Sequence, residues 1–174
     1  MARLPIVIVP NPVLRAKAKP VAAVDETIRR LIDDMLETMY AAPGIGLAAN
    51  QVGVLQRVVV LDVARADDKP QPMGLVNPEI LWRSEALHTH EEGCLSLPEQ
   101  YAEVTRPAEI GFRYLDRDGH RRELQAGGLL ATCVQHEIDH LDGILFVDHL
   151  SMLKRNIILR KLAKAQKAKE EAAM

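Results

Sequence analysis

The stretch HEIDH, residues 136–140, decides how this sequence is interpreted. On a helix, residues four apart lie on one face, so His136 and His140 can reach the same point in space. Glu137 lies beside them, where its carboxylate can act on a water molecule held by a metal ion. The spacing is typical of metal-dependent hydrolases, although a helix can also carry two histidines without binding a metal. The stretch therefore predicts a metal-binding helix in a hydrolytic site.

This helix is expected to follow the glycine pair at 127–128, to run to about Asp142 and to stop at Gly143. On a helical wheel one face carries Leu129, Cys133, His136 and His140, and an apolar flank adjoins that face. We therefore expect the helix to be buried on much of its circumference, with the metal at its polar stripe.

Composition describes an ordinary globular chain. Its 174 residues fit one catalytic domain, 1–174, and 48% apolar with 26% charged residues is typical of globular proteins. The net charge of -2 excludes a general attraction to nucleic acid or to acidic membranes, so neither DNA nor a membrane is an expected partner.

Prolines interrupt the apolar segment at the N-terminus, so no secretory signal is expected, and Leu4–Val9 is interpreted as a strand or extended arm. Cys94 and Cys133 are then free thiols, in agreement with a cytoplasmic protein.

The other elements follow from hydrophobic periodicity. A first helix is expected at 25–41, with Asp25 as its N-cap, and a last, basic helix at about 151–170. Strands are expected at 57–63, 74–82, 86–91, 101–106, 109–115 and 121–125. Because these strands follow one another without intervening helices, the sheets should be mostly antiparallel. The fold class is therefore α+β, with antiparallel sheets packed around the central HExxH helix, a first helix and a C-terminal helix.

A catalytic metal site needs a third protein ligand and an open position. His149 follows His140 by nine residues and is a weak candidate, since it also suits the turn before the last helix. Cys133 lies on the same helix face as the histidines, where three ligands in one stripe give poor tetrahedral angles. Cys94 follows a glycine in EEGCLSLPEQ and can approach from across the site. The residues favour Cys94 without deciding the matter.

Three motifs in order give a resemblance to a known family. GIGLAANQ at 44–51, EGCLS at 92–96 and QHEIDHLDG at 135–143 resemble the signature motifs of peptide deformylases, and the resemblance extends over essentially the whole chain. It implies an enzyme that removes the formyl group from the N-terminal formylmethionine of new polypeptides, giving formate and a free amino terminus. Formylmethionyl nascent peptides would be its partners.

The resemblance also implies roles for individual residues. The metal ligands would be Cys94, His136 and His140, and the metal would be Fe(II), with zinc, nickel or cobalt as substitutes. Glu137 would be the general base, while Gln51 and the backbone N–H of Leu95 would stabilise the charge that develops on the formyl oxygen. Ile45 and Gly46 would bind the substrate backbone.

Further positions are weighed against ordinary packing. Ile45, Leu129 and Cys133 could form the apolar slot for the methionine side chain, or could be plain core. Glu92 could orient His136 or pair with Arg106, or could be an exposed acid. Tyr101 and His90 depart from common members of the family, where an Arg often follows PEQ and the other position is often apolar. These two positions leave open which substrate residues after methionine are preferred.

Two alternative functions and one alternative partner accompany this interpretation. The HExxH pattern would also suit a zinc-dependent endopeptidase, and a structural metal domain would need a closed site with four ligands. The last helix carries Lys154, Arg155, Arg160, Lys161, Lys164, Lys167 and Lys169. It is either a solvated amphipathic helix or a segment that docks on ribosomal RNA.

Overall fold

The fold is taken from a computed structural model, which describes residues 2–173. Its helices are α1 (Glu26–Ala41), α2 (Gly128–Leu141) and α3 (Met152–Ala172), with short 3₁₀ helices η1 (Pro12–Arg15), η2 (Ala49–Val52) and η3 (Phe146–His149). Its strands are β1 (Gly46–Ala48), β2 (Val58–Leu61), β3 (Met73–Arg83), β4 (Leu87–Cys94), β5 (Leu97–Pro107), β6 (Glu109–Leu115) and β7 (Arg121–Gly127).

The strands form two antiparallel sheets. One has five strands in the order β1-β2-β3-β6-β7, and the other is the two-stranded hairpin β4-β5. Short turns join β4 to β5 and β6 to β7, and Gly119 in the β6–β7 turn adopts a φ of 81°. The predicted α+β class with antiparallel sheets is confirmed. In this arrangement β1 is an edge strand of the large sheet, and β4 keeps one edge unpaired.

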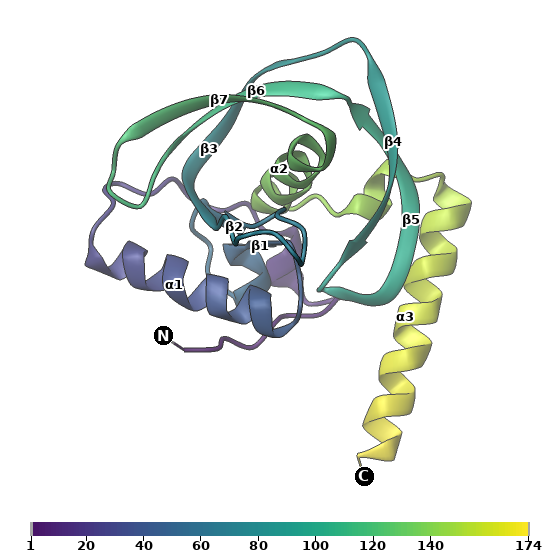
Figure 1. Cartoon of the computed structure of the whole chain (residues 1–174). Coiled ribbons are helices and arrows are strands. Elements are labelled where there is room, and N and C mark those ends of the chain that lie inside the picture. The colour runs from purple at the N-terminus through teal and green to yellow at the C-terminus, as the bar shows by residue number, and fades with distance from the viewer. Residues whose placement is uncertain (1, 174) are drawn as a thin grey trace.

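Helix α2 lies between the two sheets and is the centre of the molecule (Figure 1). Nine of its residues are buried, and the apolar ones belong to the cluster formed with the five-stranded sheet. Its first residue, Gly128, has a φ of 55°, a conformation that glycine adopts without strain. The polar face of α2 is thereby held toward the β4-β5 hairpin.

Helix α1 covers a second apolar cluster on β1 and β2. Its N-terminus is capped by Asp25, whose carboxylate accepts a hydrogen bond from the Ile28 N–H at 3.0 Å, as predicted. The buried face of α1 carries Ile28, Ile32, Met35 and Met39. This packing fixes the segment that leads from α1 into β1 and so into the site.

The N-terminal arm is extended and joins elements that lie near the site. Of the two forms that the sequence allowed for Leu4–Val9, the structure has an extended arm and no strand. The Val7 N–H donates to the Gln51 carbonyl at 2.7 Å, and the Val9 N–H donates to the Ser96 carbonyl at 3.0 Å. The arm therefore ties η2 to the β4-β5 turn.

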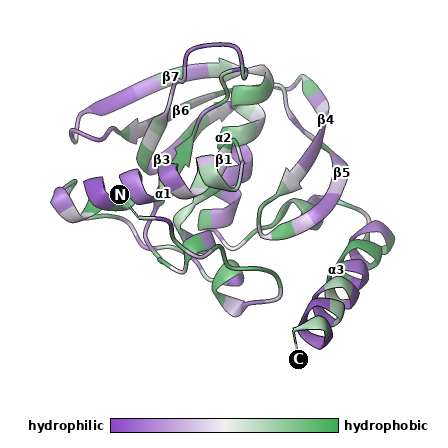
Figure 2. Cartoon of the chain, turned by 60° about the horizontal axis from the view of Figure 1, so that its bottom comes forward, coloured by the Kyte–Doolittle hydropathy of each residue, from purple (hydrophilic) through white to green (hydrophobic). Residues whose placement is uncertain are grey.

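Helix α3 is attached by few side chains. Among its described residues only Ile158 and Leu162 are buried, and its C-terminal part extends away from the other elements (Figure 1). Hydrophilic and hydrophobic bands alternate along α3, whereas α2 is largely hydrophobic (Figure 2). Within residues 2–173, no helix has the length and apolar character required to cross a membrane.

Candidate active site

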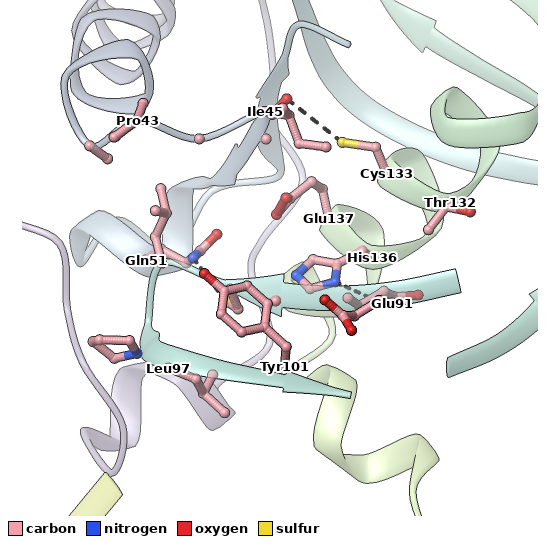
Figure 3. Close-up of a pocket in the computed structure, with 18 of the residues that line it drawn as sticks. Pro43, Ile45, Gln51, Glu91, Leu97, Tyr101, Thr132, Cys133, His136 and Glu137 are labelled. Atoms are coloured by element: carbon pink, nitrogen blue, oxygen red, sulfur yellow. Dashed lines mark hydrogen bonds and ion pairs between the residues drawn. The ribbon is translucent and has the colours of Figure 1, made fainter. Parts of the chain in front are cut away.

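A cavity of about 580 Å³ opens between β1, the β4-β5 hairpin and α2 (Figure 3). Nine of the ten residues that the sequence singled out for the site line it: Ile45, Gly46, Gln51, Cys94, Leu95, Leu129, Cys133, His136 and Glu137. The tenth, His140, lies one helical turn beyond His136 and is 1% exposed. Residues from three separate motifs thus meet at one place.

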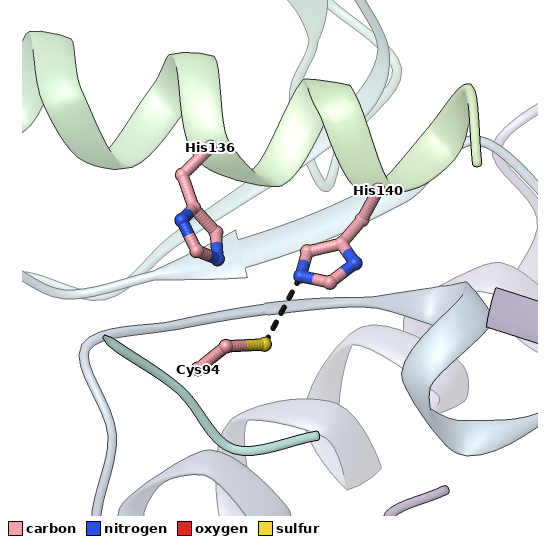
Figure 4. A group of neighbouring side chains, drawn as sticks. All are labelled: Cys94, His136 and His140. Carbon is pink, nitrogen blue, oxygen red and sulfur yellow. Dashed lines mark hydrogen bonds between the residues drawn. The ribbon is translucent and has the colours of Figure 1, made fainter. Parts of the chain in front are cut away.

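The thiol and the two imidazoles converge from different elements. Cys94 ends β4 at a register shift, and its sulfur points toward the histidine rings of α2 (Figure 4). Cys94 Sγ lies 3.3 Å from His140 Nε2, and the ligand atoms of Cys94, His136 and His140 all lie within 4.8 Å of one another. A thiolate with two imidazole nitrogens suits a divalent transition metal, so the group fits a bound metal ion.

The two other candidates for the third ligand lie elsewhere. Cys133 Sγ donates a hydrogen bond to the Ile45 carbonyl at 3.7 Å, and burial raises the pKa of its thiol well above the ordinary value. His149 Nε2 lies 2.8 Å from Asp139 Oδ2. Neither belongs to the group of converging ligand atoms within the described chain.

A buried network of charges holds His136. Glu92 Oε1 lies 2.9 Å from His136 Nδ1, and Glu92 also accepts two hydrogen bonds from Arg106, at 2.7 and 2.9 Å. Arg106 donates a third hydrogen bond to Asp139 at 2.8 Å. Fixing Nδ1 in this way leaves Nε2 of His136 free for a metal. The sequence suggested either His136 or Arg106 as the partner of Glu92, and in the structure Glu92 contacts both. The contact of Arg106 with Asp139 was not predicted from the sequence.

Burial and hydrogen bonding oppose each other in the pKa of Glu92. Burial alone would raise the pKa of this carboxyl, but hydrogen bonds from Arg106 and His136 outweigh that effect and lower it to about 2. Glu92 is therefore ionised at neutral pH and remains a hydrogen-bond acceptor. A neighbouring imidazole is held firmly by such a partner.

Glu137 points into the cavity and is 3% exposed (Figure 3). Its Oε1 is buried without a hydrogen-bond partner among the described residues. Burial is the main cause that raises the pKa of this carboxyl, to about 7, against the opposing effect of His136. Gly46 lies directly against it, since a side chain at position 46 would stand 2.6 Å from Glu137 Oε2.

Gln51 offers an amide group at the side of the site opposite α2. Its Nε2 donates to Ser96 Oγ at 3.1 Å and lies 3.4 Å from Cys94 Sγ, while its Oε1 accepts from the Ala48 N–H at 2.9 Å. Both ends of the side chain are therefore held in place. Ser96 was not singled out by the sequence analysis, although it lies two residues after Cys94 in the same motif.

The other residues that line the cavity form an apolar wall on one side and include Tyr101 and His90. Ile45 and Leu129 are partly exposed at the cavity, next to the buried Cys133. Tyr101 and His90, the two positions that depart from common members of the family, also line it. The cavity thus combines an apolar wall, a cluster of metal-ligand side chains and a buried carboxylate.

Taken together, the fold and this cavity define a metal-dependent hydrolase. Comparison with known proteins narrows the class: the family model described as polypeptide deformylase matches residues 3–156. A peptide deformylase of Methylocella silvestris is 63% identical over 166 residues, which cover 94% of this chain and 85% of that protein. One of Mesorhizobium japonicum is 55% identical over 95% of this chain and 94% of that protein.

Solved structures agree with the sequence comparisons. The crystal structure of the peptide deformylase from Ehrlichia chaffeensis matches with a TM-score of 0.92 at 41% identity, over 97% of this chain and 99% of that one. The chain belongs to the peptide deformylase family, whose members are metal-dependent hydrolases that remove N-formyl groups from nascent peptides. The comparisons do not favour the endopeptidase alternative.

The contact between Gly46 and Glu137 gives a first prediction. Gly46→Ala should lower kcat for formate release about 100-fold, because the added methyl group displaces the Glu137 carboxylate, and misplacing a reacting group by about 1 Å has an effect of this size. Steady-state kinetics on formyl-Met-Ala would measure it. Gly53→Ala is the matched control for a neighbouring glycine with open space around it, and it should change stability more than kcat. Equal kcat values for Gly46→Ala and the unaltered enzyme would contradict the prediction.

Proposed function

We propose that this chain deformylates nascent peptides as a single catalytic domain, 1–174, with Glu137 as general base and with Cys94, His136 and His140 as metal ligands. One observation carries the proposal: the sulfur of Cys94 and the two rings of α2 converge beside a buried carboxylate that has a free oxygen. The network around Glu92 supports it, since a metal ligand is generally oriented by a hydrogen bond to its other nitrogen.

The substrate would bind as an extended strand between the two sheets. Five consecutive residues of β4, His90 to Cys94, line the cavity, and so do Ile45 and Gly46 at β1. Because side chains of a strand alternate between its faces, a cavity lined by consecutive residues runs along the edge of that strand. Both β1 and β4 have an unpaired edge there, and an extended peptide can add to such an edge through its main chain. The methionine side chain would enter the apolar slot of Ile45, Leu129 and Cys133.

The chemistry assigns a step to each residue. A divalent metal bound by the three ligands supplies Lewis acidity and lowers the pKa of a bound water. Glu137 takes the proton of the attacking water at its free carboxylate oxygen and returns it to the nitrogen as the C–N bond breaks. Gln51 Nε2 and the Leu95 N–H donate to the formyl oxygen as negative charge develops there. Formate and a free amino terminus are the products.

Formate release tests this function directly. The metal-loaded enzyme should release formate from formyl-Met-Ala-Ser and should leave acetyl-Met-Ala-Ser-Leu-Ala and unformylated Met-Ala-Ser-Leu-Ala intact. Formate would be measured by a coupled dehydrogenase and the peptides by mass spectrometry. Cleavage of an internal peptide bond, without formate, would instead support an endopeptidase.

We propose Fe(II) as the metal in the cytoplasm, with zinc, nickel or cobalt as substitutes. A thiolate is a soft ligand, and Fe(II) beside a thiolate oxidises readily. Anaerobically purified protein should therefore contain about one iron per chain, and its activity should decay within hours in air while that of a nickel-substituted sample persists. Metal analysis and timed formate assays measure both. Full activity of the iron form after a day in air would contradict this assignment.

We also propose that α3 contacts ribosomal RNA. Four exposed lysines lie on its outer part, around and beyond Leu162, its last buried residue: Lys161 just before it, and Lys164, Lys167 and Lys169 after it. Replacing all four with Gln should weaken binding to ribosomes at least about tenfold at low salt and flatten its salt dependence, because each phosphate contact releases counterions. Sedimentation with ribosomes at several salt concentrations measures it.

The control for this variant neutralises acidic residues of the same segment. Glu170→Gln with Glu171→Gln alters the same part of α3, both positions being exposed, without removing positive charge. It should bind ribosomes at least as well as the unaltered chain. Activity on formyl-Met-Ala should be the same in all three proteins, since α3 lines no part of the cavity. Unchanged ribosome binding by the lysine variant would exclude this contact.

A further inference from the structure

The segment that joins α1 to β1 forms one wall of the cavity. All residues of this connector, 42–46, line the cavity, and β1 begins at the last of them. The Gly44 N–H donates to the Met39 carbonyl at 2.8 Å, which ties the start of the connector to α1. At the other end lies Ile45, and the contacts of its carbonyl group decide where the wall meets the sheet.

Two donors hold the Ile45 carbonyl. It accepts a hydrogen bond from the Asp62 N–H at 2.9 Å and one from Cys133 Sγ at 3.7 Å, the latter drawn in Figure 3. The amide is the stronger of the two, because a thiol is a weak donor. Asp62 directly follows β2, whose last residue, Leu61, is the register partner of Gly46. The position of Asp62 therefore fixes the Ile45 carbonyl and the edge of β1.

The carboxylate of Asp62 is in turn held by three donors. Asp62 is 7% exposed, and it accepts hydrogen bonds from the Ala64 N–H at 3.0 Å, the Gln71 N–H at 3.1 Å and the Tyr40 hydroxyl group at 2.5 Å. A buried carboxylate depends on such donors, and hydrogen bonds to an ionised group are stronger than those between neutral groups. Two of the donors belong to the chain just after Asp62, whereas Tyr40 comes from α1.

Tyr40 connects the two ends of the connector. It is the last residue but one of α1, and it is 46% exposed, so packing in the core does not account for its position. Burial is the first cause that raises the pKa of its hydroxyl group to about 12, followed by the hydrogen bond to Asp62. The phenol is therefore protonated at neutral pH and donates to the carboxylate that fixes Ile45.

We propose that Tyr40 is a positioning residue: through Asp62 it holds the Ile45 carbonyl and the edge of β1 where the main chain of the substrate binds. The inference rests on the proposed function, in which an extended peptide adds to that edge. Tyr40 belongs neither to the cavity lining nor to the group of metal-ligand side chains. It should therefore act on KM and not on kcat, because contacts that are equal in the ground state and the transition state change binding alone.

Tyr40→Phe removes only the hydroxyl group and tests this role. KM for formyl-Met-Ala-Ser should rise about tenfold at unchanged kcat and metal content, since a hydrogen bond to a charged group is lost. Asp62→Ala should raise KM at least as much, and adding Tyr40→Phe to it should have little further effect, because both changes break the same contact. A KM within twofold of the unaltered enzyme in Tyr40→Phe, or a lower kcat at unchanged KM, would overturn the proposal.

Hydrogen exchange gives a measurement that does not depend on turnover. The Asp62 amide, which donates to the Ile45 carbonyl, should exchange at least about tenfold faster in Tyr40→Phe, because local opening of the connector becomes easier. NMR of the metal-loaded protein measures this rate. Equal exchange rates in the two proteins would overturn the role of Tyr40 alone, whereas lack of formate release from formyl-Met-Ala-Ser by the unaltered enzyme would overturn the proposed function.

Tyr114→Phe is the matched control, since it also removes one phenol hydroxyl group. Tyr114 lies on β6 outside the cavity lining, and its hydroxyl group makes no hydrogen bond with another residue of the described chain. This variant should change neither KM nor the exchange rate of the Asp62 amide. A rise in KM as large as that of Tyr40→Phe would show that the contact with Asp62 is not the source of the effect.

Discussion

Glu137→Gln should reduce kcat for formate release by about 10³-fold while the protein retains its metal, because the variant loses its proton carrier and keeps all three ligands. Glu137 is buried, and one of its oxygens has no partner among the described residues. Gln is nearly isosteric with Glu, so the shape of the cavity should persist. The measurements are steady-state kinetics on formyl-Met-Ala and metal content by elemental analysis.

Two comparison proteins make the result specific. Cys94→Ala should lose both metal and activity, so that loss of activity with metal retained distinguishes a proton carrier from a ligand. Glu123→Gln removes an exposed acid of β7 and should behave as the unaltered enzyme. A Glu137→Gln variant that keeps more than a tenth of kcat would exclude Glu137 from proton transfer.

Arg106→Met should lower the free energy of unfolding by about 3–5 kcal/mol, because it leaves the buried carboxylate of Glu92 and the partly buried carboxylate of Asp139 without their cation. Arg106 and Glu92 are 6% and 4% exposed at their side chains, and Asp139 accepts a further hydrogen bond from Arg106. Urea denaturation of the metal-loaded protein measures the loss. Because Glu92 also orients His136, metal affinity should fall in the same variant.

The matched control is an exposed pair of the same chemistry. Arg113 donates two hydrogen bonds to Glu79 between β6 and β3, with side chains 46% and 58% exposed. Arg113→Met should cost at most about 1 kcal/mol, since water and salt screen such a pair. If both variants lost the same stability, burial of the Arg106 network would not be the source of its effect.

Much of the fold was predictable because its determinants are local. The N-cap at Asp25 and the glycine after the HEIDH helix each mark an element boundary by short-range chemistry. The sequence pattern did not predict which strands belong to the same sheet. The separation of β4 and β5 from the other five strands depends on long-range pairing, and β5 begins four residues before the predicted strand because its first part closes the cavity.

The candidate site was predictable where a motif carried it. HEIDH gave two converging imidazoles from helical geometry alone, but the choice among Cys94, Cys133 and His149 needed the resemblance, because the residues themselves allowed all three. Asp139 was missed because its role depends on Arg106, 33 residues away in sequence. The roles proposed for these residues stay predictions until the variants are measured.

The open edges of β1 and β4 have a consequence for the range of proteins that one such enzyme can serve. Main-chain groups are the same in every polypeptide. Recognition through two sheet edges therefore does not depend on the side chains that follow the first residue of the substrate. A cell that begins its proteins with one formylated residue can then rely on a single catalyst for all of them. The residues after the first methionine would then affect how fast a new protein is deformylated, but not whether it is deformylated.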